Sequence, residues 1–112
     1  MCYDKIQNFR ALLIILYLCT TVDHTIMTER YNAFLNRIGN VIAKDRIYTD
    51  ELRRFAWGTD AGFYRMTPQM VIRSASEKEV ASILKAASES NVPVTFRAAG
   101  TSLSGQAVSD SV

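Results

Sequence analysis

The chain has few of the residues that build catalytic centres or covalent frameworks in small proteins. Its 112 residues include one histidine, His24, and two cysteines, Cys2 and Cys19. Two cysteines close to the N-terminus cannot form a disulfide framework or a metal site of several thiolates. A single histidine excludes a cluster of histidine ligands and a complete Ser-His-Asp triad within this chain. These scarcities argue against zinc modules and against hydrolases of that type, and we expect no metal site.

The sequence also lacks an excess of one charge. Lys and Arg number 13 against 11 Asp and Glu, which gives a net charge of +2. Acidic and basic residues alternate along the chain, whereas nucleic-acid-binding proteins gather Lys and Arg on one face, so we expect no nucleic acid among the partners. With 48% hydrophobic residues, 5 Gly and 2 Pro, the composition is that of one small globular domain.

No apolar run is long enough to cross a membrane. The longest, residues 11–19, falls short of the roughly 20 residues required. It follows Lys5 and Arg10 in the order of a secretory signal, but no small-x-small cleavage site follows it. Three interpretations of residues 1–26 stay open: an extension upstream of a start at Met27, a signal-like segment, or a first helix. We expect a cytoplasmic protein or one peripheral to the cytoplasmic membrane, with a signal-like segment as the alternative.

Residues 27–67 are predicted to form a helix followed by an ordered loop. Apolar residues recur at helical spacing and predict an amphipathic helix from Thr28 to about Lys44, with Gly39 weakening it. The apolar positions are Tyr31, Phe34, Leu35, Ile38, Val41 and Ile42.

The remainder of that segment, residues 45–67, has no sustained period. A short helical turn is expected around residues 50–55. Aromatic residues beside Gly and Asp in residues 55–65 predict an ordered loop that packs against another part of the molecule.

Two β-prone runs flank a helix in residues 68–112. The runs are residues 70–73 and 94–97, rich in Val, Ile, Thr and Phe. A strand, a helix and a strand within about thirty residues predict a βαβ unit with parallel strands and a right-handed crossover. The predicted fold class is therefore α+β, with an α/β-type βαβ unit preceded by an N-terminal helix.

The helix between the two runs has clear boundary signals. Ser76 with Glu79 three positions later is a capping-box pattern at its start. Asn91 suits the left-handed residue that ends a helix, and Pro93 prevents its continuation.

A small-residue segment, residues 97–106, follows the second β-prone run. Its glycines allow positive φ, and successive backbone amides in such a turn form a concave site for anions. Thr101, Ser102 and Ser104 add hydroxyl donors, and Arg97 adds a positive charge. Loops at the carboxyl end of parallel strands are frequent ligand sites. The pattern favours phosphate binding, with a tight surface turn as the alternative, and matches neither Walker A nor G-x-G-x-x-G.

Residues 93–106 resemble the pyrophosphate loop of the FAD-linked oxidase family, whose flavin domain has the PCMH-type fold. Residues 71–80 are similar to the strand and capped helix before that loop. Residues 46–50 and 56–61 are similar to the entry region of the family's D-lactate dehydrogenase-like branch. The resemblance covers about residues 27–112 and implies the first subdomain of a PCMH-type FAD-binding domain.

The resemblance implies FAD as the cofactor, held through its diphosphate. The backbone amides of residues 98–101 would face the diphosphate, the hydroxyls of Ser102 and Ser104 would assist, and a Cβ at Gly100 would collide with the ligand. The cofactor-binding residues are then Arg97, Ala98, Ala99, Gly100, Thr101, Ser102, Leu103, Ser104 and Gly105.

Three positions depart from the family pattern. Ala98 and Ala99 stand where many members have glycine, so both residues must have negative φ. Ser74 replaces a proline that is common at the end of the strand, which affects rigidity more than binding.

The family relation further implies an FAD-linked oxidoreductase that oxidises a 2-hydroxy acid such as D-lactate or glycolate. In that family a second subdomain and a substrate-binding cap domain follow, and they carry the catalytic residues. We therefore expect the N-terminal part of a longer enzyme, with residues 68–112 as a truncated FAD-binding domain and no catalytic residue in this sequence. An incomplete domain of this kind is expected to be inactive alone and to self-associate. The alternative is a non-catalytic, small α/β interaction module.

Overall fold

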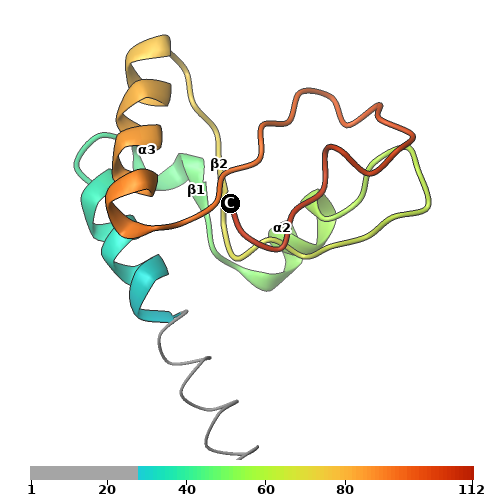
Figure 1. The fold of residues 1–112 in the computed structure, drawn as a ribbon, viewed down its shortest axis with the longest axis horizontal. Coiled ribbons are helices and arrows are strands. Elements are labelled where there is room, and N and C mark those ends of the chain that lie inside the picture. The colour runs from blue at the N-terminus through green and yellow to red at the C-terminus, as the bar shows by residue number, and fades with distance from the viewer. Residues whose placement is uncertain (1–27) are drawn as a thin grey trace, which may run out of the picture. The chain divides into compact units, whose positions relative to one another are not determined.

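The computed structural model describes residues 28–112 (Figure 1). The three interpretations of residues 1–26 therefore lie outside the described residues. The chain divides into two compact units, Met1–Arg30 and Tyr31–Val112. The second unit contains the sheet, α2, α3 and the loops that build the candidate site.

The first described helix covers residues 28–38 and ends well before the predicted end at Lys44. Gly39 donates its amide to Leu35 O at 2.9 Å, and the chain then leaves the helix. Glycine is a weak helix former, which explains the early end. The helical spacing nevertheless identified core residues, because Phe34, Ile38 and Ile42 are at most 1% exposed.

A small antiparallel sheet joins two segments that are far apart in the sequence. After a 3-10 turn, η1 (Lys44–Arg46), strand β1 (Ile47–Tyr48) pairs with β2 (Val71–Ile72), with Ile47 opposite Ile72 and Tyr48 opposite Val71. The antiparallel pairing supports the α+β class. Strand β2 falls within the β-prone run at residues 70–73, whereas β1 was not predicted.

The predicted parallel pair is not confirmed. Among the described residues, 94–97 are not in a strand, and their backbone pairing is limited to a hydrogen bond from Thr95 N to Val112 O at 2.6 Å. Strand β2 pairs with β1, and β2 and residues 94–98 line a common cavity and form no backbone hydrogen bonds with each other. The βαβ unit is thus reduced to one strand, one helix and an extended segment.

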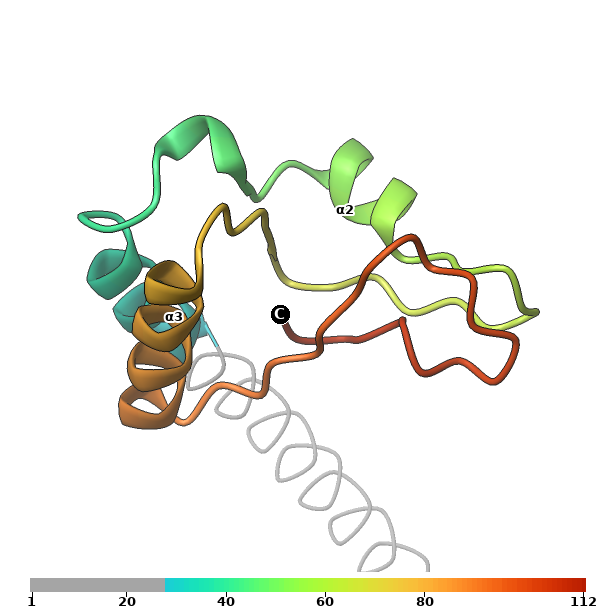
Figure 2. The same ribbon diagram turned by 90° about the horizontal axis from the view of Figure 1, so that it is seen from above.

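Helix α3 (Glu77–Ser90) has the predicted boundaries. The Ser76 side chain accepts a hydrogen bond from the Glu79 amide at 3.3 Å, and Asn91 ends the helix with φ 53° and ψ 46°. The apolar face of α3 packs into the core through Ile83, Ala86 and Ala87. Residues 31–38 lie beside α3, as Figure 2 shows, and an Arg37–Glu89 ion pair joins the two helices.

The Glu79 carboxylate ties the start of α3 to the sheet. It accepts two hydrogen bonds of 2.8 Å from Arg46 and one of 2.7 Å from the Ala75 amide. The capping box is therefore modified, because Glu79 reaches Ala75 N rather than Ser76 N. The hydrogen bonds from Arg46, then that from Ala75, lower the pKa of Glu79 to about 2.

The predicted helical turn around residues 50–55 is confirmed as α2 (Glu51–Trp57), whose start is capped by the Asp50 side chain. Two long irregular segments lie side by side next to α2, the entry loop (residues 58–67) and the small-residue loop (residues 97–105) (Figures 1 and 2). Together they form the candidate site.

Candidate functional site

The backbone of the small-residue loop turns at its two glycines. Gly100 has φ 73° and Gly105 has φ 74°, a region that favours glycine over residues with a Cβ. Asn91 is the one non-glycine residue with positive φ in residues 28–112. Ala98 and Ala99 therefore satisfy the condition of negative φ that their departure from the family pattern imposed.

The loop presents a row of backbone donors. Within the described part of the chain, no group accepts a hydrogen bond from the amides of residues 98–101. The Gly100 carbonyl, in contrast, accepts a hydrogen bond from Ala61 N at 2.9 Å. The loop thus uses a carbonyl for internal structure and leaves a series of amides without an acceptor among the described residues. Adjacent amides of this kind suit the oxygens of an anion.

The hydroxyl groups of the loop differ in their surroundings. Ser102 Oγ accepts hydrogen bonds from the amides of Ser104 and Gln106, both at 3.3 Å. Its oxygen therefore shapes the turn, while its O–H can still donate. Thr101, Leu103 and Ser104 are exposed.

Arg97 begins the loop and extends back to the end of α2. Its Nη1 donates to Trp57 O at 2.8 Å and to Thr59 O at 2.6 Å, and its guanidinium lies 5.2 Å from the centre of the Trp57 ring. The guanidinium also lies against the backbone of Gly100, because a Cβ added there would be 2.6 Å from Arg97 Cζ. The space that a side chain at Gly100 would need is therefore filled by Arg97.

The entry loop is folded by its own hydrogen bonds. Asp60 Oδ1 accepts from the Gly62 amide at 2.7 Å, and Met66 N donates to Gly58 O at 3.1 Å. Thr59 and Arg65 form an isolated antiparallel bridge. These contacts are of the kind that an ordered loop requires.

The two loops also meet at two other places. Besides the Ala61–Gly100 hydrogen bond, a Cβ at Gly62 would lie 2.9 Å from Leu103 O. A Cβ at Gly105 would lie 2.9 Å from Cδ2 of Tyr64. Both glycines therefore permit close approach between the loops.

The entry loop's place in the site was missed at residue level. The residues involved are Thr59, Ala61, Gly62 and Tyr64 of the entry loop, together with Trp57 at the end of α2. The signal that could have indicated them was the aromatic residues beside Gly and Asp.

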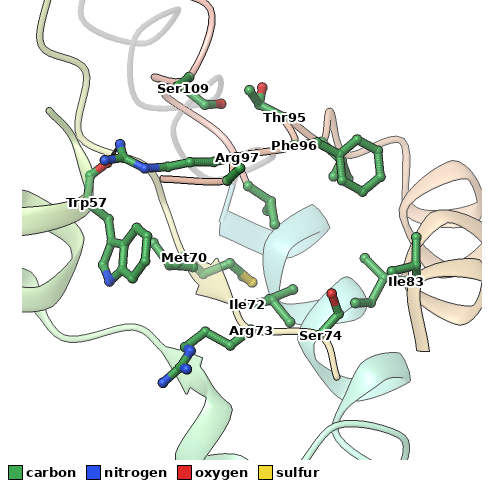
Figure 3. A pocket seen from close by; sticks show the side chains of 16 residues that line it. Trp57, Met70, Ile72, Arg73, Ser74, Ile83, Thr95, Phe96, Arg97 and Ser109 are labelled. Carbon is green, nitrogen blue, oxygen red and sulfur yellow. Dashed lines mark hydrogen bonds between the residues drawn. The ribbon is translucent and has the colours of Figure 1, made fainter. Parts of the chain in front are cut away.

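A cavity of about 300 Å³ lies beside the small-residue loop (Figure 3). Arg97 and Trp57 line one part of it, and Ile72 of β2 and Ile83 of α3 line another. Most of its wall is apolar, with hydroxyl groups such as that of Thr95 at intervals. The cavity therefore offers apolar surface next to a loop with free donors.

Comparisons with known proteins place these features in context. Residues 68–112 match a family model described as the FAD binding domain. No curated protein and no solved structure matches the chain. Among the residues that the structure describes, no helix has the length and apolar character needed to cross a membrane. Domains of the matched family generally belong to oxidoreductases. The segment that contains α3 and the small-residue loop matches an FAD-binding domain, and FAD is the cofactor that it indicates.

Proposed function

We propose that residues 97–105 hold the diphosphate of FAD in an oxidoreductase whose substrate is a 2-hydroxy acid such as D-lactate or glycolate. The observation that carries the cofactor part of this proposal is the row of unpaired amides at residues 98–101. It lies within the segment that matches the FAD binding domain. Bound FAD would supply a hydride acceptor, and the protein would supply its placement.

The donors of the loop fit a diphosphate in kind and in charge. A diphosphate carries two negative charges and several acceptor oxygens, and backbone amides with hydroxyl donors are suited to both. Ser104 adds an exposed hydroxyl, and the Ser102 O–H remains a donor. The Arg97 guanidinium forms no ion pair within the described residues, so its positive charge is not neutralised by a carboxylate.

The substrate part of the proposal has a different support. It draws on the similarity of residues 46–50 and 56–61 to the entry region of the D-lactate dehydrogenase-like branch. Residues 58–61 pack against the small-residue loop through the Ala61–Gly100 hydrogen bond. The segment that resembles this branch thus lies beside the proposed cofactor loop.

The cofactor proposal is tested by following individual amides during titration. The ¹⁵N-labelled chain would be titrated with FAD, with inorganic pyrophosphate and with riboflavin, which has the flavin ring but no phosphate. We expect FAD and pyrophosphate to shift the amide signals of residues 98–101, and riboflavin to leave them unchanged. This readout detects weak binding as well as tight binding.

A matched pair of glycine variants gives the control. Gly100→Ala should abolish the shifts, because Gly100 has positive φ and no room for a Cβ. Gly39→Ala should preserve them, since Gly39 has no positive φ and lies outside the site. If neither FAD nor pyrophosphate moves the loop amides of the wild type, the loop does not hold the diphosphate.

A non-catalytic interaction module remains the second candidate, favoured by the exposed apolar side chains near the two loops. Leu52 is 79% exposed, Phe63 106% and Leu103 75%. Such residues on a solvated surface favour contact with a partner or self-association. Sedimentation analysis with and without FAD distinguishes the two: a module would associate with no response to FAD.

A further inference from the structure

Arg97 makes its hydrogen bonds within the chain, to the backbone at the end of α2 and the start of the entry loop. Its Nη1 donates hydrogen bonds to the carbonyls of Trp57 and Thr59. Its Nε is buried without a hydrogen-bond partner in the described structure. Figure 3 shows the side chain reaching to the backbone of Trp57.

We propose that Arg97 is a positioning residue that clamps the small-residue loop to the end of α2 and the entry loop, and that it acts on cofactor binding through the position of that loop. This inference rests on the proposed function, because it explains how the loop that would hold the diphosphate is itself held. Arg97 acts through two backbone carbonyls and through its contact with the backbone of Gly100.

The geometry gives the clamp a defined effect. The guanidinium is fixed on one side by the carbonyls of Trp57 and Thr59, and on the other it lies against Gly100. The Gly100 carbonyl is bound to Ala61 N, only two residues after Thr59. Arg97 and the Ala61–Gly100 hydrogen bond therefore brace the same turn from two points. Loss of the guanidinium should make the turn at Gly100 mobile, so that the amides of residues 98–101 no longer keep a fixed arrangement.

The substitution Arg97→Lys distinguishes a positioning role of Arg97 from a role that depends only on its charge. Arg97→Lys keeps the positive charge, but the lysine side chain is shorter and ends in a compact ammonium group. It lacks the planar guanidinium, which in the wild type contacts the two carbonyls, the Trp57 ring and Gly100. Arg97→Gln removes the charge as well. Arg37→Lys is the matched control, since Arg37 pairs with Glu89 on α3.

The experiment first measures the chain without ligand. The exchange rate of the Ala61 amide with water reports the loop–loop hydrogen bond, and fluorescence reports Trp57, the one tryptophan of the chain. We expect Arg97→Lys and Arg97→Gln to raise the Ala61 exchange rate about tenfold and to shift the Trp57 emission. Arg37→Lys should change neither. An unchanged Ala61 rate in both Arg97 variants overturns the clamp.

The second measurement adds FAD and pyrophosphate and follows the amides of residues 98–101. A positioning role predicts that Arg97→Lys loses affinity about tenfold, nearly as much as Arg97→Gln. A contribution of Arg97 through its charge alone predicts instead that Arg97→Lys retains most of the affinity, and this overturns the inference. If the wild-type amides do not respond to either ligand, the proposed function fails, and the ligand-free measurement shows separately whether Arg97 holds the loop.

Discussion

Replacing Gly100 by alanine tests the junction between the two loops. The new Cβ would lie 2.6 Å from Arg97 Cζ and would sit on a residue with φ 73°. Relief of the contact requires Arg97 to move away from the carbonyls of Trp57 and Thr59. Gly100→Ala therefore imposes backbone strain and also disrupts the two hydrogen bonds that the charged guanidinium of Arg97 donates.

The two effects have separable magnitudes. A left-handed conformation costs a residue with a Cβ about 1–2 kcal/mol. Hydrogen bonds that involve a charged group contribute about 1.5–3 kcal/mol, and displacement of Arg97 would lose part of that. We expect Gly100→Ala to lower the free energy of unfolding by roughly 2–4 kcal/mol in the wild-type background. In an Arg97→Ala background only the backbone strain remains, so the cost should fall to about 1–2 kcal/mol.

Urea denaturation of the wild type, both single variants and the double variant measures this difference, with helix α3 followed by circular dichroism. The two substitutions should be non-additive, and the double variant should be more stable than the sum of the single effects predicts. If Gly100→Ala costs the same in both backgrounds, the Arg97 guanidinium does not occupy the space beside Gly100.

Three further predictions concern the scaffold that carries the site. The pKa of Glu79 is lowered from 4.5 to about 2, so its stabilising contribution is complete above pH 4.5 and is lost as the pH falls towards 2. Urea midpoints should therefore drop more steeply across this range in the wild type than in Glu79→Gln. Ser76→Ala should destabilise the chain by about 1 kcal/mol and Ser76→Asp should not, which thermal unfolding checks. Ser111→Ala should cost about 1–3 kcal/mol and more than Tyr31→Phe, because buried Ser111 Oγ accepts from Tyr31 and donates to Pro93 O. Equal costs in denaturation would contradict this arrangement.

The best-predicted part of the fold is determined by short-range chemistry. Ser76, Asn91 and the apolar face of α3 act within one helix, so spacing and capping preferences predicted its start and its end. The short turn that was expected around residues 50–55 is α2, and in the structure Asp50 caps it from the preceding position. The helix of residues 28–38 shows where apolar spacing fails to predict a helix end. The spacing continues past Gly39, and Ile42 is buried in the core although it lies beyond the helix.

The sheet could not be predicted from local pattern. Strands β1 and β2 have two residues each, and their pairing depends on which segment lies beside Val71 and Ile72 in the folded chain. Two β-prone runs around a helix are typical of a parallel pair, yet β2 pairs with a segment that precedes it in the sequence. Short strands offer too few residues for alternation to show, so only tertiary contacts decide their partner.

The position of Gly100 changes how a glycine in a phosphate-binding loop is interpreted. From sequence, glycine at this position implied space for the ligand. In the structure the corresponding space is taken by Arg97 of the same chain. A substitution at Gly100 would therefore reduce FAD binding even if the diphosphate never approached that residue, because it would displace the clamp and the turn with it. Loss of cofactor in Gly100 variants is consequently evidence for the loop–loop junction, whereas evidence for the diphosphate site has to come from the amides of residues 98–101 themselves.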